Sequence, residues 1–301
     1  MRTDRSFEWP TLLMLALTYG LWVGGTLLWP VSGLLSVILT GVAVAQFSSL
    51  QHEVLHGHPF RNPHLNHALI FPALALVVPY ERFRDTHLQH HFDPALTDPY
   101  DDPESNYQDP AVWAAMSRPL RALLRVNNTL LGRILLGPAI GTWFFIKGDI
   151  ALYRQGQRQI LRAWVLNGLG VLLVVGWLAA FTEMPFLAYV AAAYLGYSLL
   201  KIRTYLEHRA HETPRARTVI IEDKGPLALL YLNNNLHVVH HMHPAEPWYR
   251  LPALYAERRE HYQRRNEAYV YRSYGEIFRR YLFKAKDPVP HPVWPVRKID
   301  G

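Results

Sequence analysis

The stretch LLSVILTGVAVAQFSSLQHEVLH, residues 34–56, decides the fold. Residues 34–50 are almost wholly apolar, and a run of about 17 residues can cross the core of a bilayer as a helix. The run continues into His52 and His56, whose spacing of four places both imidazoles on one face of that helix. We therefore expect a membrane-spanning helix that delivers two histidines at or just beyond one membrane face.

Three other apolar segments complete the membrane part of the expected fold. Residues 11–29 are too long a run for the core of a signal peptide, and 161–181 and 184–200 form a second pair. Short turns near residues 30–33 and 182–183 would close each pair into a hairpin. The sequence predicts an all-α integral membrane protein of one domain, 1–301, with spans at 11–29, 34–50, 161–181 and 184–200 and a helical cap formed by 51–160 and 201–301.

The segments between the hairpins are expected to lie at or near the membrane surface. Residues 68–78 are apolar but too short to span and contain a proline, which predicts a re-entrant or interfacial segment. Residues 93–110 are acidic and proline-rich, which predicts a loop. Residues 111–150 mix apolar and basic positions, which is typical of amphipathic helices on a membrane surface.

The basic residues indicate the orientation. Neither outer turn contains any of the 31 Lys and Arg residues, so the positive-inside rule places both termini and the cap in the cytoplasm. The net charge of +7 forms no nucleic-acid recognition motif, and we assign it to anionic lipid headgroups and to an acidic electron-carrier protein. The length of the chain, without a fused electron-transfer domain or retention signal, favours a bacterial inner membrane.

Eight histidines fall into three tight clusters. HEVLH contains His52 and His56, HLQHH contains the trio 87, 90 and 91, and HVVHH contains the trio 237, 240 and 241. Imidazole is the commonest metal ligand near neutral pH, because most of it is uncharged there. Four to six ligands are usual for one ion, so eight predict two metals or one metal with an unusually rich shell. The candidate ligands are His52, His56, His87, His90, His91, His237, His240 and His241.

Histidine-rich sites of this kind suit iron, zinc or copper, and the ligand set alone does not choose among them. The chain has no cysteine, which excludes an iron–sulfur cluster, a thiolate–metal site and disulfides. Simple hydrolysis needs only a zinc with three ligands, whereas a multi-histidine iron site can reduce dioxygen and attack an unactivated C–H bond. An apolar substrate would explain why such a site lies at a bilayer surface.

The chain resembles the superfamily of membrane fatty acid desaturases and hydroxylases. Its clusters follow the order HxxxH, HxxHH and HxxHH of the three histidine boxes in that superfamily. The flanking sequences PYERFRDTHLQHH (79–91) and NNNLHVVHHMHPAEPWYRLPAL (233–254) also resemble those of acyl-lipid desaturases. The resemblance extends over roughly residues 11–255.

This resemblance implies an O2-dependent oxidoreductase with two non-haem iron ions, four spanning helices and a cytoplasmic cap. It implies a ninth ligand, His208 in RTYLEHRAHE, and a reaction that introduces a double bond into a fatty acyl chain of a lipid. The chain has no Rossmann fingerprint, no cysteine and no recognisable haem domain, so electrons would come from an external ferredoxin or cytochrome b5-like donor.

Other residues near the clusters are weaker candidates. His58, Glu207 and Asn235 could be metal ligands or could orient the ligands, and a helix N-cap is an equal alternative for the asparagines 233–235. Metal-bound histidines usually donate their other N–H to an acceptor. The nearest carboxylates in the sequence are Glu53, Asp85, Asp93, Asp98 and Glu207.

Two other functions are open at this point. A hydroxylase or ketolase of the same superfamily, acting on a lipid, sterol, carotenoid or alkane, would have the same boxes. A non-enzymatic metal protein, such as a zinc transporter or sensor, is of a different class. It predicts ionisable groups inside the spanning helices, and the four expected segments contain essentially none.

Overall fold

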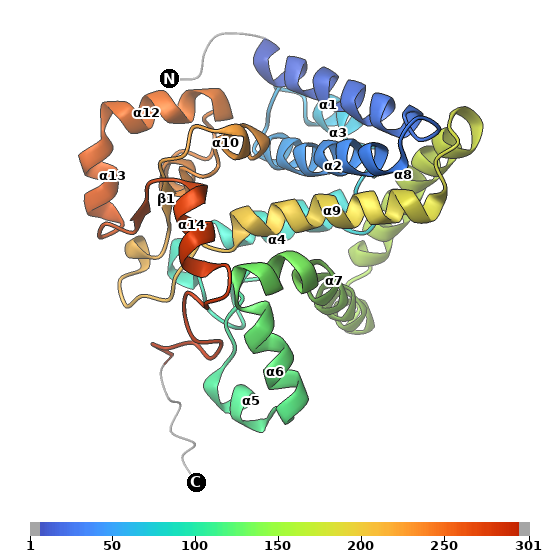
Figure 1. Ribbon diagram of the computed structural model, residues 1–301. Coiled ribbons are helices and arrows are strands. Elements are labelled where there is room, and N and C mark those ends of the chain that lie inside the picture. The colour runs from blue at the N-terminus through green and yellow to red at the C-terminus, as the bar shows by residue number, and fades with distance from the viewer. Residues whose placement is uncertain (1–6, 295–301) are drawn as a thin grey trace.

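The computed structural model describes residues 7–294, so the expected cytoplasmic position of the two termini concerns residues outside this range. Long helices form one side of the molecule, and short helices and loops form the other (Figure 1). The long helices are α1 (Trp9–Leu27), α2 (Gly33–Leu55), α7 (Leu130–Arg154), α8 (Gln159–Phe181) and α9 (Phe186–Thr204).

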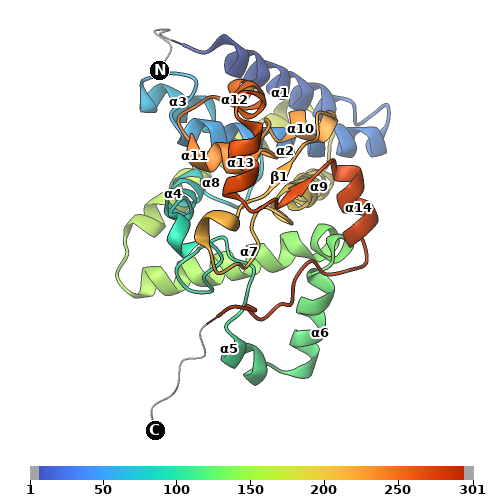
Figure 2. The same cartoon turned by 90° about the vertical axis from the view of Figure 1, so that its left-hand side faces the viewer.

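The shorter elements form the cap and the connections. Between α2 and α7 lie α3 (Pro63–Leu69), α4 (Tyr80–His90), a 3-10 turn (Asp93–Ala95), α5 (Pro110–Ala115) and α6 (Arg118–Asn127). After α9 come a 3-10 turn (Pro214–Ala216), β1 (Ile220–Ile221), α10 (Pro226–Leu230), α11 (His237–Met242), a 3-10 turn (Trp248–Arg250), α12 (Leu251–Glu257), α13 (Arg259–Arg265), β2 (Val270–Tyr271) and α14 (Tyr274–Tyr281). Figure 2 shows these C-terminal elements facing the viewer, in front of the long helices.

Glycines allow α1, α2 and α9 to pack closely. A Cβ atom at Gly25 would lie 2.8 Å from Thr40 Oγ1, and one at Gly196 would lie 2.7 Å from Val44 Cγ1 and 3.0 Å from the Gly41 carbonyl oxygen. Small residues at such crossings let two backbones approach closely. In a membrane the hydrophobic effect does not drive helices together, so this close van der Waals packing helps to hold them. The α1–α2 hairpin therefore packs directly on α9.

Within residues 7–294, four helices are long and apolar enough to cross a membrane; the number agrees with the expectation, but one of the four helices is not an expected span. They are α1, α2, α7 and α8. The expected fourth span, 184–200, coincides with α9, which is less apolar because it contains three tyrosines and ends with Lys201 and Arg203. Over residues 111–150, where we expected amphipathic surface helices, the structure has α5, α6 and most of α7, and α7 is long and apolar enough to span a membrane.

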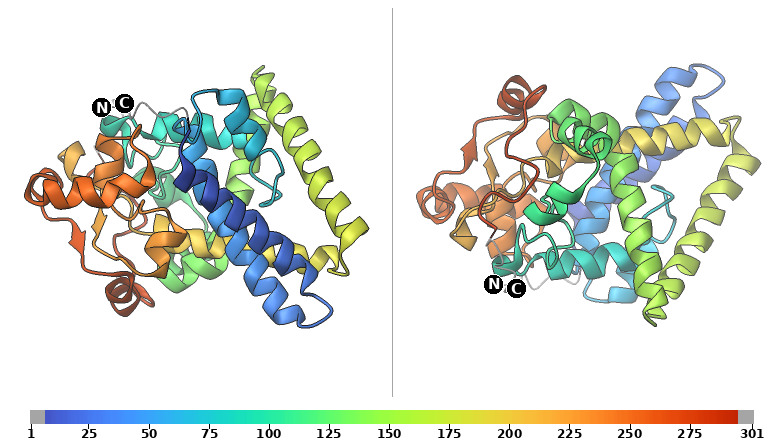
Figure 3. Two further views of the ribbon diagram at one scale, coloured as in Figure 1. Left: turned by 90° about the horizontal axis from the view of Figure 1, so that it is seen from above. Right: turned by 90° about the horizontal axis from the view of Figure 1, so that it is seen from below.

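The short apolar segment 68–78 enters the space between the long helices. The chain leaves α3 at Leu69 and has no helix until α4, and side chains from three long helices bind its carbonyl oxygens. Tyr19 Oη donates to Leu69 O at 2.7 Å, Tyr189 Oη to Leu74 O at 2.8 Å and Asn167 Nδ2 to Leu76 O at 2.9 Å. Irregular backbone at membrane depth needs such partners, because lipid offers none. Figure 3 shows this segment between the diverging arms of α7 and α8.

The cap is not entirely helical, because it also contains a small sheet. β1 and β2 pair in parallel, with Ile220 opposite Val270 and Ile221 opposite Tyr271. These strands could not be predicted from the sequence, because two residues per strand are too few to show an alternating pattern of apolar and polar residues. This small sheet joins the chain just after α9 to the chain just before α14, and it lies beside α11, because Ile221 N donates to Asn235 O at 2.8 Å.

Candidate metal centre

Three helix ends bring the histidine clusters together. His52 lies in the last turn of α2 and His56 is its C-cap residue. α4 contains His87 and His90, His91 is its C-cap residue, and α11 contains the whole third cluster. His208 alone lies on no helix: it follows α9 and pairs with Thr218 in an isolated β-bridge.

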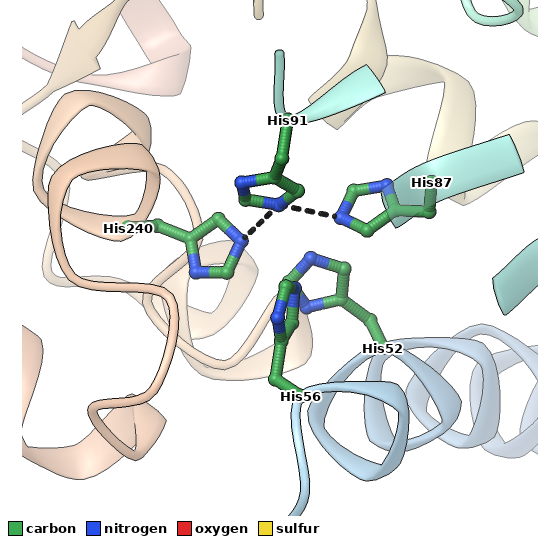
Figure 4. A group of neighbouring side chains, drawn as sticks. All are labelled: His52, His56, His87, His91 and His240. Carbon is green, nitrogen blue, oxygen red and sulfur yellow. Dashed lines mark hydrogen bonds between the residues drawn. The ribbon is translucent and has the colours of Figure 1, made fainter. Parts of the chain in front are cut away.

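The structure brings five of the nine predicted ligands into one group. Figure 4 shows their rings turned toward a common centre, and one nitrogen from each lies within 4.8 Å of the others. His91 Nε2 is 3.0 Å from His87 Nε2 and 3.2 Å from His240 Nε2. The group consists of His52, His56, His87, His91 and His240.

The other four predicted ligands form a second group. His208 Nε2 is 2.8 Å from His90 Nε2 and 3.1 Å from His237 Nε2. The members are His90, His208, His237 and His241. The two groups adjoin, because the rings of His91 and His241 stack with their centroids 4.4 Å apart. Together the two groups contain every histidine predicted as a ligand.

The HxxHH spacing explains how the two groups share α4 and α11. His87 and His91 are four residues apart on α4 and belong to the first group, while His90 belongs to the second. On α11 the pair four residues apart, His237 and His241, belongs to the second group, and His240 belongs to the first. Residues four apart lie on one helix face, and the histidine just before the second of them is rotated about 100° from it around the helix axis. Each of these two HxxHH boxes therefore contributes to both groups, whereas His52 and His56 both belong to the first.

Three ring nitrogens that face away from the groups have oxygen partners within 2.8 Å. His87 Nδ1 is 2.8 Å from Glu104 Oε1, His90 Nδ1 is 2.7 Å from Asp102 Oδ1 and His237 Nδ1 is 2.8 Å from Asn234 Oδ1. An acceptor at Nδ1 keeps the proton there and leaves the Nε2 lone pair free. These partners were missed in the sequence: Asp102 and Glu104 lie in the acidic loop 93–110, where nothing in the spacing distinguishes them from their neighbours.

The carboxylates expected to orient the rings have other partners or lie farther away. Glu53 Oε1 is 4.0 Å from His52 Nδ1, and Glu53 Oε2 accepts a bond from Trp248 N. Glu207 Oε1 is 2.9 Å from Arg203 Nε and 4.0 Å from His237 Nδ1. Asp85 pairs with Arg84 at the surface, and Asp98 accepts from backbone N–H groups of its own loop. The side chain of Asp93 is outside the described part of the structure.

Neither His58 nor Asn235 joins a histidine group. His58 Nδ1 lies 2.7 Å from Glu8 Oε1, which agrees with the end of α2 turning its ring away. Asn235 Nδ2 donates to Ile221 O at 2.6 Å and to Asp223 O at 3.2 Å, so it holds the end of β1 beside α11. Its neighbour Asn234 makes the contact with the ring of His237.

Burial and mutual repulsion keep most of these imidazoles uncharged. Burial lowers the pKa of His208, and the ring of His90 adds to the effect. Burial likewise lowers the pKa of His237 and His240, with contributions from His241 and His52 respectively. His90 differs: burial lowers its pKa, but Glu104 and Asp102 outweigh burial and raise the pKa to about 9.

The donor set fits two cations. The Nε2 atoms of His52 and His56 are buried and have no hydrogen-bond partner among the described residues. Two ligand nitrogens that each lie about 2.1 Å from one ion are about 3.0 Å apart when they subtend a right angle. The Nε2–Nε2 distances of 2.8–3.2 Å are of this size. The groups could therefore hold one ion each.

The comparison with known proteins agrees with this geometry. A family model described as fatty acid desaturase matches residues 27–273 of the 301. No curated relative matches the sequence significantly. The matched range contains both histidine groups and the carboxylates that contact them, and it extends over most of the chain. The chain therefore belongs to the fatty acid desaturase family.

Proposed function

We propose that the protein is an O2-dependent oxidoreductase that introduces a double bond into a fatty acyl chain of a lipid. The observation that carries this proposal is the pair of adjoining groups formed by nine histidines. The first group would hold one iron ion and the second another, and these ions would supply the oxygen-activating chemistry. In the reaction two C–H bonds break and one C=C bond forms. Dioxygen is reduced to two waters, with two of its four electrons from the acyl chain and two from a donor.

The protein's own residues would position the reaction and exclude water. Asp102, Glu104 and Asn234 hold Nδ1 protons, which fixes three rings with their Nε2 atoms toward the centre. His52, His90 and His240 are each only 2% exposed, so bulk water is largely kept from the groups. A double bond at one carbon pair further requires that the chain be held rigidly beside the centre.

The convergence of the histidines limits how the chain can cross a membrane. His208 and His90 are in contact, so both lie on the same side of the membrane, and an even number of the helices between them must cross it. If α7, α8 and α9 all crossed the membrane, the two histidines would lie on opposite sides. α9 packs along α2, and Trp22 of α1 donates to Tyr189 of α9 at 2.9 Å. These contacts support α8 and α9 as the second hairpin, with α7 lying at the membrane surface.

The same argument supports a centre on one face of the membrane. The connection between α8 and α9, residues 182–185, contains no Lys or Arg, and neither does the turn between α1 and α2. The positive-inside rule then supports a cytoplasmic position for the centre and both termini. The compartment that we propose is the inner membrane of a bacterium. The basic cap would there meet an acidic ferredoxin or a cytochrome b5-like donor.

A hydroxylase or ketolase acting on a lipid, carotenoid or alkane is the second candidate. The observation that favours it equally is the histidine centre itself, because abstraction of a second hydrogen and transfer of an oxygen atom can start from the same groups. A non-enzymatic metal protein is less well supported, since a transporter would not need two enclosed groups of five and four imidazoles.

Lipid mass spectrometry of cells grown in air tests the proposal. Cells that express the protein with a donor should accumulate a lipid lighter by two hydrogens in one acyl chain. The His240→Ala variant should give no product while still inserting into the membrane, because it removes a ligand from the first group. A product heavier by one oxygen would shift the assignment to hydroxylation. Equal product from the wild type and His240→Ala would contradict the proposed site.

A further inference from the structure

The segment that carries His208 lacks the support that the other histidines have. Eight of the nine lie in or at the end of α2, α4 or α11, whose backbones are held by their own hydrogen bonds. His208 follows α9 outside any helix, in a single β-bridge where Arg209 N donates to Arg217 O at 2.8 Å and Val219 N donates to Glu207 O at 3.0 Å. Its ring makes a 3.4 Å contact with Thr218 Oγ1 on the side away from the group. Beyond this one bridge, the position of His208 depends on contacts with distant parts of the chain.

The C-terminal segment supplies these contacts. Lys286 Nζ donates to the carbonyl oxygen of His208 itself. The same ammonium is 3.2 Å from Asp287 Oδ2, and Asp287 accepts the hydroxyl proton of Tyr107. Tyr107 Oη in turn accepts from Ala210 N at 2.9 Å. Lys286, Asp287 and Tyr107 thus hold the segment at His208 and two residues after it, and we call these three residues the clasp.

The surroundings of Lys286 fit this role. Its side chain is only 12% exposed, and its ammonium lies 5.8 Å from the ring centre of Tyr107 and 5.9 Å from that of Tyr269. A buried ammonium needs hydrogen-bond acceptors, because leaving one unpaired in a protein interior is costly. The His208 carbonyl, the Asp287 carboxylate and two aromatic faces meet that need, so the lysine has one favourable position.

The clasp also joins two of the three chain segments that carry the second histidine group, namely the His208 segment and, through the loop that contacts His90, the end of α4. Tyr107 lies at the end of the acidic loop whose Asp102 binds His90. Gln108 N donates to Val289 O, and His291 N donates to Gln108 O, each in a short ladder with the C-terminal segment. Because His90 Nε2 and His208 Nε2 are 2.8 Å apart, a shift of the His208 segment would open the second group, and it would leave the first group intact because that group has no ligand on this segment.

We propose that Lys286 is a positioning residue for the second metal ion, acting through the His208 backbone with Asp287 and Tyr107. This inference rests on the proposed two-metal function and deepens it, since it makes occupancy of one site depend on the C-terminal segment. The first group, which contains no residue of the clasp or its neighbours, should be independent of it.

The test measures metal per chain in purified, iron-loaded protein after exposure to increasing chelator. The Lys286→Met variant should release one of two ions at a chelator concentration about 10- to 100-fold lower than the wild type, the usual effect of removing support behind a ligand. The second ion should be released as in the wild type. Tyr107→Phe, which keeps the ring and removes only the hydroxyl, should show the same selective loss.

Lys284→Met is the matched control, because it removes the same charge two residues away at an exposed position and should release metal as the wild type does. Release of both ions together from Lys286→Met, with a lower melting temperature, would show a general structural role and overturn the proposal. Release indistinguishable from the wild type in both Lys286→Met and Tyr107→Phe would also overturn it, while leaving the proposed function standing. A folded wild type that binds no metal would refute the proposed function and the clasp together.

Discussion

At the scale of single residues, the spacing within each histidine box decides how the ligands are shared. In HxxHH the outer pair, four residues apart, faces one group and the middle residue faces the other. The spacing of the three clusters was sufficient to predict eight of the nine ligand candidates, because helix periodicity links spacing to direction, and His208 was predicted from the resemblance to the desaturase and hydroxylase superfamily. It was not sufficient to predict Asp102, Glu104 and Asn234, because loop carboxylates and amides meet a ring only through the tertiary fold.

Asp102 provides a prediction at this scale. Its carboxylate accepts from His90 Nδ1, Thr97 N and Glu104 N, so it fixes both the ring and the loop. Asp102→Asn should weaken metal binding to the second group by about 10- to 100-fold, measured by chelator competition. Asp101→Asn is the control, because that side chain is exposed at the neighbouring position. Equal metal affinity in the two variants would show that the contact with His90 does not support the site.

At the scale of elements, the apolar runs in the sequence predicted candidate spans that coincide with α1, α2 and α8. Composition did not decide which of α7 and α9 crosses the membrane. α7 is apolar enough to span, whereas α9 contains tyrosines and two cations. The tyrosines have structural partners: Tyr189 binds both Trp22 and the Leu74 carbonyl. Such residues lower the hydropathy of a helix while stabilising its packing. Hydropathy alone therefore cannot distinguish a tyrosine that is paired inside the protein from one that faces water.

The segment between α3 and α4 gives a prediction at this scale. A Cβ atom at Gly170 of α8 would lie 2.5 Å from Phe71 O and 3.0 Å from Ala73 N, both of them backbone atoms. Gly170→Ala should therefore destabilise the protein by about 1–3 kcal/mol, the usual cost of overpacking, seen as a lower melting temperature. Gly176→Ala on the same helix meets nothing within 4 Å and should leave the melting temperature equal or higher. Equal melting temperatures for the two variants would contradict the close approach of this segment to α8.

At the scale of the whole molecule, four separate stretches of the chain converge on one centre. These stretches are the end of α2 (residues 52–56), the end of α4 (87–91), the segment after α9 (residue 208) and α11 (237–241). The sequence indicated that they belong together, since three clusters of this form beside apolar segments imply a shared site. Their division into five and four could not be predicted, because it depends on how α4 and α11 are rotated relative to α2.

The central claim is that each histidine group holds its own metal ion. The most direct measurement is the metal content of the purified wild type, expressed with sufficient iron and determined by elemental analysis per folded chain. The arrangement of five and four histidines predicts two iron ions per chain. One ion per chain, or zinc as the only metal retained, would contradict the claim.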